Sequence, residues 1–256
     1  MRKIVTSIKK DNVVDLDKLT EAGLSDGYAN KSGETLLTIA AEFNSPKCIK
    51  LLVEKGADLY ETNASGLTPV NVAIYNDNSE AVIALVEGGC NLNYFDGRSA
   101  VPLHWAAQHG KCKISSLLIE HGADVDCKGV NGSVALHFAA RSGHADIIDV
   151  LITSGANVNA CTDDDAVALH TAAATPKIEI YEALVNAGAR VDILRYGKDS
   201  VLESLSDMYK LMGNMLLSKD EADRICCLLI KNGSEVDEKF ISLANEKGLS
   251  MSLGAC

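Results

Sequence analysis

A glycine recurs along this chain at a constant interval of 33 residues. The recurring positions are Gly56, Gly89, Gly122, Gly155 and Gly188. A small, a polar and an aliphatic residue follow it, as in Gly122-Ala123-Asp124-Val125. A period of this length indicates a stack of similar units, in which each unit packs on its neighbours.

A second pattern keeps the same interval. Val101-Pro102-Leu103-His104 is followed by Val134-Ala135-Leu136-His137 and by Val167-Ala168-Leu169-His170. One period begins at Asp96. Its first two residues, Asp96 and Gly97, are typical of a turn, and Pro102 is typical of the first residue of a helix. Leu103, Ala106 and Ala107 then form an apolar stripe at helical spacing, and a second apolar helix follows.

This unit of turn, helix, loop and second helix resembles the ankyrin repeat, over roughly residues 30 to 237. The segment from Val101 to Ala107 is the best match to the family pattern. The resemblance implies an all-α ankyrin-repeat solenoid, with stacked helix-turn-helix units joined by short loops like β-hairpins. We expect the first helices and the tips of these loops to line one concave face.

The spacing divides the chain into about six repeats between two terminal caps. The expected ranges are an N-terminal capping unit at 1–29, repeats at 30–62, 63–95, 96–128, 129–161, 162–194 and 195–238, and a C-terminal capping helix and tail at 239–256. The last repeat carries a twelve-residue insertion, because Gly233 lies 45 residues after Gly188. A lengthened first helix and loop explain the insertion most simply, and a partner-binding protrusion around Met208–Leu217 is the alternative.

Charge and composition exclude several classes of function. The formal net charge is −11, so a nucleic-acid surface, which needs clustered Lys and Arg, is not expected. We find no hydrophobic signal-peptide segment and no run of about 18 apolar residues. The eight cysteines lack metal-binding spacing, which favours free thiols in a reducing compartment. We therefore expect an intracellular, cytoplasmic protein without membrane contact, with the nucleus as an alternative.

No set of residues predicts catalysis or a cofactor. The family uses the histidine at positions 104, 137 and 170 for hydrogen bonds near the turn, and one repeat of separation is too far for a shared metal ion. The acidic run Asp163-Asp164-Asp165 lacks the ligand pattern of a calcium loop. It is read instead as a solvated turn or as a contact for a basic group of a partner.

We therefore expect a non-enzymatic module that binds a protein through the concave face, as a monomer and without cofactor or metal. An inhibitor or adaptor that occludes or recruits a signalling or ubiquitin-ligase partner is the alternative. Exposed aromatic residues and Arg are frequent anchors of interfaces. The candidate contact residues are Tyr75, Tyr94, Phe95, Arg98, Trp105, Gln108, His109, Phe138, Arg141, Asp163 and Asp164. Trp105 and Phe138 have an alternative role as fillers between helices.

Overall fold

The computed structural model describes residues 2–21, 34–212, 218–236 and 241. The chain divides into two compact units, unit 1 (Met1–Asp124) and unit 2 (Val125–Cys256), and each is described by itself. Within the described residues, regular structure is helical except for isolated bridge residues, at Thr35 and in the antiparallel pair Arg195 and Asp199.

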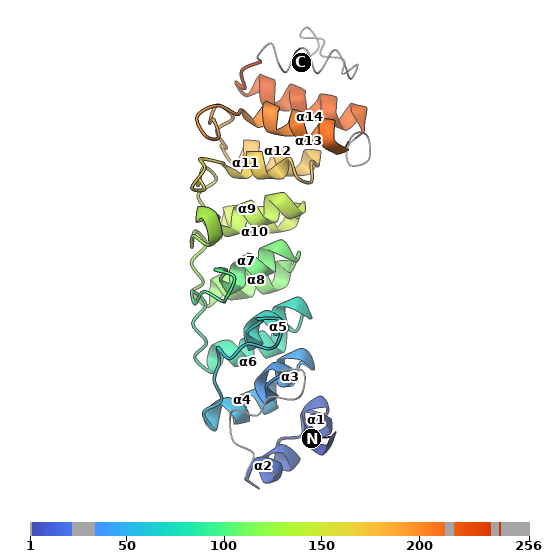
Figure 1. Cartoon of the computed structure of the whole chain (residues 1–256), viewed down its shortest axis with the longest axis vertical. Helices are drawn as coiled ribbons and strands as arrows, with labels where there is room; N and C mark the ends of the chain where they lie inside the picture. The colour runs from blue at the N-terminus through green and yellow to red at the C-terminus, as the bar shows by residue number, and fades with distance from the viewer. Residues whose placement is uncertain (1, 22–33, 213–217, 237–240, 242–256) are drawn as a thin grey trace. The chain divides into compact units, whose positions relative to one another are not determined.

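Unit 1 consists of helix pairs arranged in two rows (Figure 1). Its helices are α1 (Arg2–Lys9), α2 (Val13–Glu21), α3 (Leu36–Glu42), α4 (Pro46–Glu54), α5 (Pro69–Tyr75), α6 (Ser79–Glu87), α7 (Pro102–Gln108) and α8 (Cys112–Glu120). The first helices α1, α3, α5 and α7 contact one another in succession, and so do the second helices α2, α4, α6 and α8.

Unit 2 repeats the same arrangement. It contains η1 (Val130–Gly132), α9 (Ala135–Ser142), α10 (Ala145–Thr153), α11 (Ala168–Ala172), α12 (Ile178–Asn186), α13 (Val201–Met212) and α14 (Lys219–Lys231). The first helices α9, α11 and α13 form one row, and the second helices α10, α12 and α14 form the other.

The apolar residues that recur in the sequence form the core of each unit. One leucine of the second helix recurs at the 33-residue interval and is buried each time, at Leu52, Leu85, Leu118, Leu151 and Leu184. Burying one such side chain contributes about 1.5–3 kcal/mol. The first helices carry alanines that are fully buried, such as Ala106, Ala107, Ala139 and Ala140, and these small side chains let successive first helices pack closely.

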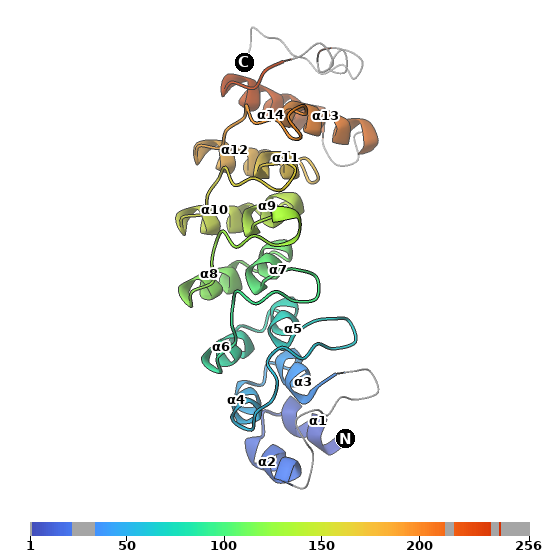
Figure 2. The ribbon, with the colours of Figure 1, turned by 60° about the vertical axis from the view of Figure 1, so that its left-hand side comes forward.

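Similar loops connect successive repeats. In unit 1, the backbone N–H groups of Asn63 and Asp96 donate to the carbonyls of Leu67 and Ala100. In unit 2, the same bond runs from Gly129 to Ser133, from Thr162 to Ala166 and from Arg195 to Asp199. The side-chain oxygens of Asn63, Asp96 and Thr162 also accept backbone N–H bonds inside their own loops. Figure 2 shows these loops before α5 and α7, where they project beyond the ends of the helices.

The recurring glycine follows the second helix of each repeat. Its φ angle lies between 87° and 92° at the five positions found from the sequence, and it is 100° at Gly233. L-residues rarely adopt this backbone conformation, whereas glycine adopts it freely. The conformation therefore explains why the glycine recurs.

The all-α ankyrin-repeat solenoid predicted from the sequence is confirmed. Helices α1 and α2 lie in the predicted N-terminal cap, although residues 22–33 are outside the described part. Helix α13 is a first helix lengthened to 12 residues, and residues 213–217 of the insertion are not described. The predicted C-terminal cap lies outside the described residues except for Ile241. Six cysteines carry free thiols, whereas Cys227 departs from that expectation because it is disulfide-bonded.

Candidate protein-binding surfaces

A buried carboxylate organises one loop of unit 1. Asp96 is only 7% exposed, and its Oδ1 accepts the backbone N–H groups of Arg98 at 2.8 Å and Ala100 at 3.0 Å. Its Oδ2 accepts the indole N–H of Trp105 at 2.7 Å and the side-chain amide of Asn71 at 2.9 Å. A buried carboxylate needs such hydrogen bonds to replace the water that it loses on burial. Asp96 therefore ties its own loop to α7 and to α5 of the preceding repeat.

Four of the predicted contact residues form one continuous array around Trp105. The indole ring of Trp105 stacks on the imidazole of His109, with 5.4 Å between ring centroids. His109 meets the ring of Tyr75 edge-on at 5.4 Å, and the guanidinium of Arg98 lies 5.3 Å from the Trp105 ring. Tyr75 is 58% exposed, whereas Trp105 is buried. Trp105 thus supports the array from inside, and Tyr75 presents it to solvent.

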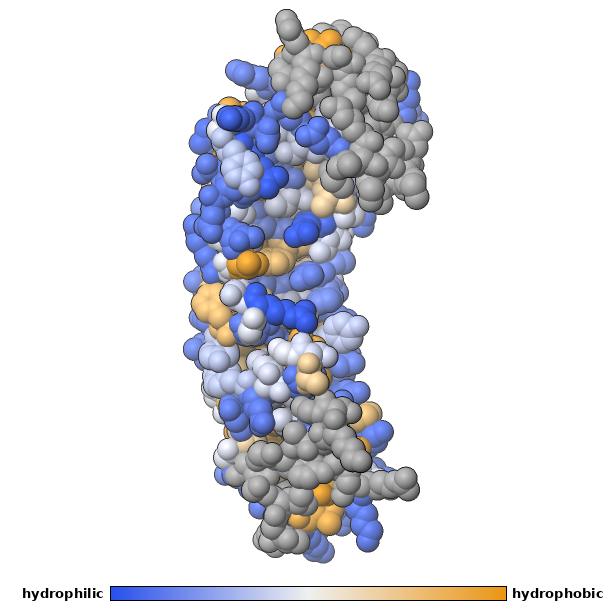
Figure 3. All heavy atoms as spheres, in the orientation of Figure 1, coloured by the Kyte–Doolittle hydropathy of each residue, from blue (hydrophilic) through white to orange (hydrophobic). Residues whose placement is uncertain are grey.

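Tyr94 and Phe95 lie at the loop, and Tyr94 belongs to a separate contact. The ring of Tyr94 packs against the ring of Tyr60, with 4.2 Å between the ring centroids. The hydroxyl of Tyr60 accepts the backbone N–H of Asn91. Tyr94 and Phe95 are 44% and 45% exposed. Gln108, at the end of α7, is also exposed. On the face shown in Figure 3, hydrophobic residues form small patches among mostly hydrophilic ones.

In unit 2, two of the three recurring histidines connect successive repeats. The Nδ1 atoms of His137 and His170 accept the backbone N–H of Val134 and Val167 at the starts of their helices. Their Nε2 atoms face the carbonyls of Ala166 and Asp199 in the following loop, at 3.1 and 3.2 Å. Burial lowers the pKa of both imidazoles, so the neutral ring is favoured. This is the structural role that the resemblance implied.

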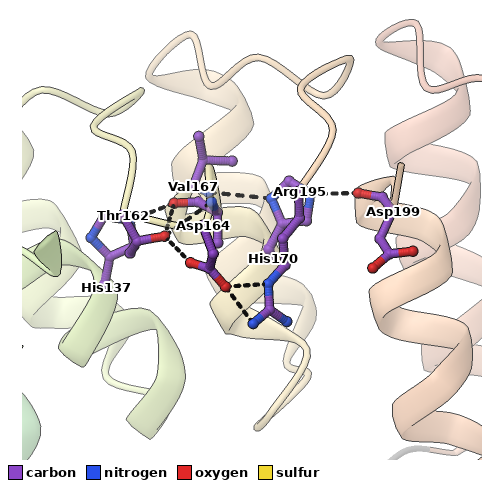
Figure 4. A network of polar contacts seen from close by, with 8 residues as sticks. His137, Thr162, Asp164, Val167, His170, Arg195 and Asp199 are labelled. Atoms are coloured by element: carbon purple, nitrogen blue, oxygen red, sulfur yellow. Dashed lines mark hydrogen bonds and ion pairs between the residues drawn. The ribbon is translucent and has the colours of Figure 1, made fainter. Parts of the chain in front are cut away.

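The acidic run of unit 2 is partly neutralised within the chain (Figure 4). The Oδ2 atom of Asp164 binds Nε of Arg195 at 2.7 Å and a terminal nitrogen of the same guanidinium at 2.5 Å. Partial burial alone would raise the pKa of Asp164, but the Thr162 hydroxyl and the Arg195 guanidinium outweigh it and lower the pKa to about 2. Asp164 is therefore already paired, while Asp163 and Asp165 remain exposed.

A polar groove of about 440 Å³ lies beside this ion pair in unit 2. Its lining includes Arg141, Asp164, His170, Arg195, Asp199 and Asp207 together with hydroxyl and alanine side chains. Arg141 projects from the last turn of α9 and is exposed. Phe138 on the same helix is half-buried. The groove thus contains two of the predicted contact residues, Arg141 and Asp164.

The comparisons with known proteins agree with this architecture. A family model for ankyrin repeats in three copies matches residues 9–96, 37–129 and 103–195. The chain belongs to the ankyrin repeat family.

Two solved ankyrin repeat domains have the same fold. The ankyrin repeat domain of Bcl-3, described as a unique member of the IkappaB protein family, has a TM-score of 0.72 and 22% identity, covering 88% of this chain and 97% of that domain. The human ASB11 ankyrin repeat domain has a TM-score of 0.71 and 19% identity, covering 91% and 99%. No curated protein matches the chain by sequence. Ankyrin repeat domains generally mediate protein–protein interaction.

Sequence reasoning missed several residues that shape these ankyrin repeat surfaces. Asp96 was assigned only to a turn, and Asn71, Tyr60 and Arg195 were not singled out. Asn71 does have a signal, because it stands at the position of the recurring histidine and makes the equivalent link to the next loop. In the part of the chain that the structure describes, no three potential metal ligands cluster, and no helix is long and apolar enough to cross a bilayer.

Proposed function

We propose that this chain is a non-enzymatic interaction module that binds a protein partner through the loop tips and first helices, the concave face of the family. The array of Tyr75, His109, Trp105 and Arg98 carries this proposal. A buried carboxylate holds Trp105 in place, so Tyr75 and His109 present a surface that loses little entropy on binding. Tyr94 and Phe95 add exposed aromatic area at the loop.

The remaining parts of the proposal rest on the charge and on the family. The acidic chain repels nucleic-acid phosphate, so we propose a protein partner for a cytoplasmic monomer, with the nucleus as an alternative compartment. Phe138, Arg141, Asp163 and Asp164 of unit 2 are proposed as further contacts. A role as an inhibitor or adaptor for a signalling or ubiquitin-ligase partner remains the alternative.

The test compares proteins captured from cells by the wild type and by a double variant, Phe95→Ala with Arg98→Ala. A second double variant, Lys47→Ala with Lys113→Ala, changes exposed residues of the second helices and serves as the control. We expect the loop variant to lose a defined set of proteins, identified by mass spectrometry, that the control variant retains. Equal capture by all three proteins would show that this surface is not the binding site.

A further inference from the structure

Some charged side chains of the groove in unit 2 have a partner of opposite charge within the chain, and others do not. Asp164 and Arg195 form an ion pair with each other. Arg141, in contrast, makes no side-chain hydrogen bond or ion pair with any residue that the structure describes. The carboxylate of Asp199 likewise has no such bond within the described residues, because only its backbone carbonyl and N–H are used. Among the residues that the structure describes, the groove therefore presents one available cation, Arg141, and one available anion, Asp199.

These two charges stand in different repeats. Arg141 belongs to the last turn of α9, whereas Asp199 lies two residues before the start of α13, two first helices further along the row. Neighbouring helices pack about 10 Å apart, so the two charges are separated by roughly 20 Å along the row. An extended chain covers that distance in roughly six residues, at about 3.3 Å each.

The surroundings of both charges suit a peptide rather than a small ion. Hydroxyl groups of Ser133 and Ser204 line the groove and can bond to a peptide backbone, and Ala173 and Ala174 leave room for it. The three carboxylates Asp164, Asp199 and Asp207 outnumber the two guanidiniums, which disfavours an isolated phosphate group. The neutral imidazole of His170 adds no positive charge.

We propose that this groove binds an extended peptide segment of the partner that carries an acidic and a basic side chain roughly six residues apart. The acidic side chain pairs with Arg141, whose planar guanidinium suits a carboxylate, and the basic side chain pairs with Asp199. The inference deepens the proposed function and rests on it. It adds a rule for the charge pattern of the segment that unit 2 recognises.

The probe is a displayed library of random peptides of about twelve residues, long enough to span the groove when extended. Four full-length proteins serve as bait: the wild type, Arg141→Glu, Asp199→Lys and the control Arg190→Glu. Arg190 is exposed and pairs with Asp192 outside the groove, so its reversal changes the net charge equally without changing the groove. Circular dichroism and thermal unfolding establish that each bait is folded before selection.

We expect the wild type and Arg190→Glu to select peptides with an acidic and a basic residue at the proposed separation. Arg141→Glu should select a basic residue in place of the acidic one, and Asp199→Lys an acidic residue in place of the basic one. For one selected peptide, Arg141→Glu should weaken binding by about tenfold, as expected when an exposed charge pair becomes a repulsion. Replacing the acidic residue of that peptide by Lys should restore binding to Arg141→Glu.

Three results would overturn the inference: no selected peptide, peptides without the charge pattern, or a pattern that Arg141→Glu leaves unchanged. The proposed function is tested separately, through Phe95 and Arg98 of unit 1. If the loop variant loses its partners while the peptide selection fails, the interaction module stands and only the charge rule is wrong.

Discussion

The indole nitrogen of Trp105 lies 2.7 Å from Oδ2 of Asp96, so helix α7 is bonded to the loop that precedes it. Trp105 is buried on the first helix of its repeat, and Asp96 begins the loop of the same repeat. The bond fixes the ring on which His109 and Arg98 pack. The exposed array of unit 1 therefore depends on a pair that is itself hidden from solvent.

Asp96→Asn should destabilise the protein by about 2–4 kcal/mol, because the amide has one acceptor oxygen where the carboxylate has two. Either the loop N–H groups of Oδ1 or the indole N–H of Trp105 then loses its acceptor. Urea unfolding measures this loss. Trp105 is the only tryptophan of the chain, so its fluorescence should also shift towards that of a more polar environment in the folded variant. Asp165→Asn, at an exposed aspartate, is the control. An equal effect of the two substitutions would contradict the importance of the Asp96 bonds.

Acidification should destabilise the protein through His137 and His170. Burial lowers the pKa of both in the folded state, so below an ordinary histidine pKa of about 6.5 the unfolded chain binds protons that the folded chain does not. The contribution of the two neutral imidazoles to stability is therefore fully present above the ordinary histidine pKa. It is lost as the pH falls from about 7 to about 5. Protonation of Nδ1 would also abolish its bond to the helix start.

The measurement is the free energy of unfolding in urea across this pH range. The double variant His137→Asn with His170→Asn should be less stable at neutral pH by about 2–4 kcal/mol, from the loss of buried hydrogen bonds, and should respond less to acid. His121→Asn, at the exposed histidine that follows α8, is the control and should keep the wild-type response. An unchanged acid response in the double variant would exclude these histidines as its source.

Removing the guanidinium of Arg195 should raise the pKa of Asp164 from about 2 towards its ordinary value near 4. A lowered carboxyl pKa stabilises the fold above about pH 4, and this contribution is lost as the pH falls towards 2. Arg195→Met should therefore reduce the loss of stability in this window. Carbon-13 NMR of the aspartate carboxyls measures the pKa directly. Arg190→Met, which removes the partner of Asp192, should leave the Asp164 resonance unaffected.

Gly132→Ala should destabilise unit 2 more than Gly197→Ala. Both glycines have similar positive φ angles, 69° and 64°, so the backbone cost of about 1–2 kcal/mol is shared. A Cβ atom at Gly132 would lie 2.5 Å from the Asp163 carboxylate and 3.0 Å from its backbone nitrogen, which donates to Asn131, whereas Gly197 has open space. Thermal unfolding of the two variants isolates this steric effect. Equal melting temperatures would show that the loop adapts without cost.

The fold could be predicted from the sequence because its determinants are local and repeated. The glycine after each second helix, the buried leucine and the histidine near the first helix recur at one interval, and each acts within its own repeat or the next. Where the interval changes, at the insertion before Gly233, the prediction could not be equally detailed.

The candidate surfaces could be predicted only in part, because their geometry depends on pairs that no repeat rule specifies. Three consecutive aspartates look equivalent in sequence, yet Arg195, 31 residues later, pairs with Asp164 alone. Trp105 was proposed both as a contact and as a filler, and its burial shows how it can support contacts without being exposed. Asp96 looked like an ordinary turn residue because its bonds to Asn71 and Trp105 are tertiary.

The matching bonds of His137 and His170 have a consequence for engineering. Each imidazole reaches a carbonyl 29 residues further along, at Ala166 and Asp199. Excising residues 167–199 would join Ala166 to Ser200 and leave the acceptor of His137 in place, with α13 following it directly. The chain can thus be shortened by one whole period with the His137 bond kept, although Asp164 then loses its partner Arg195.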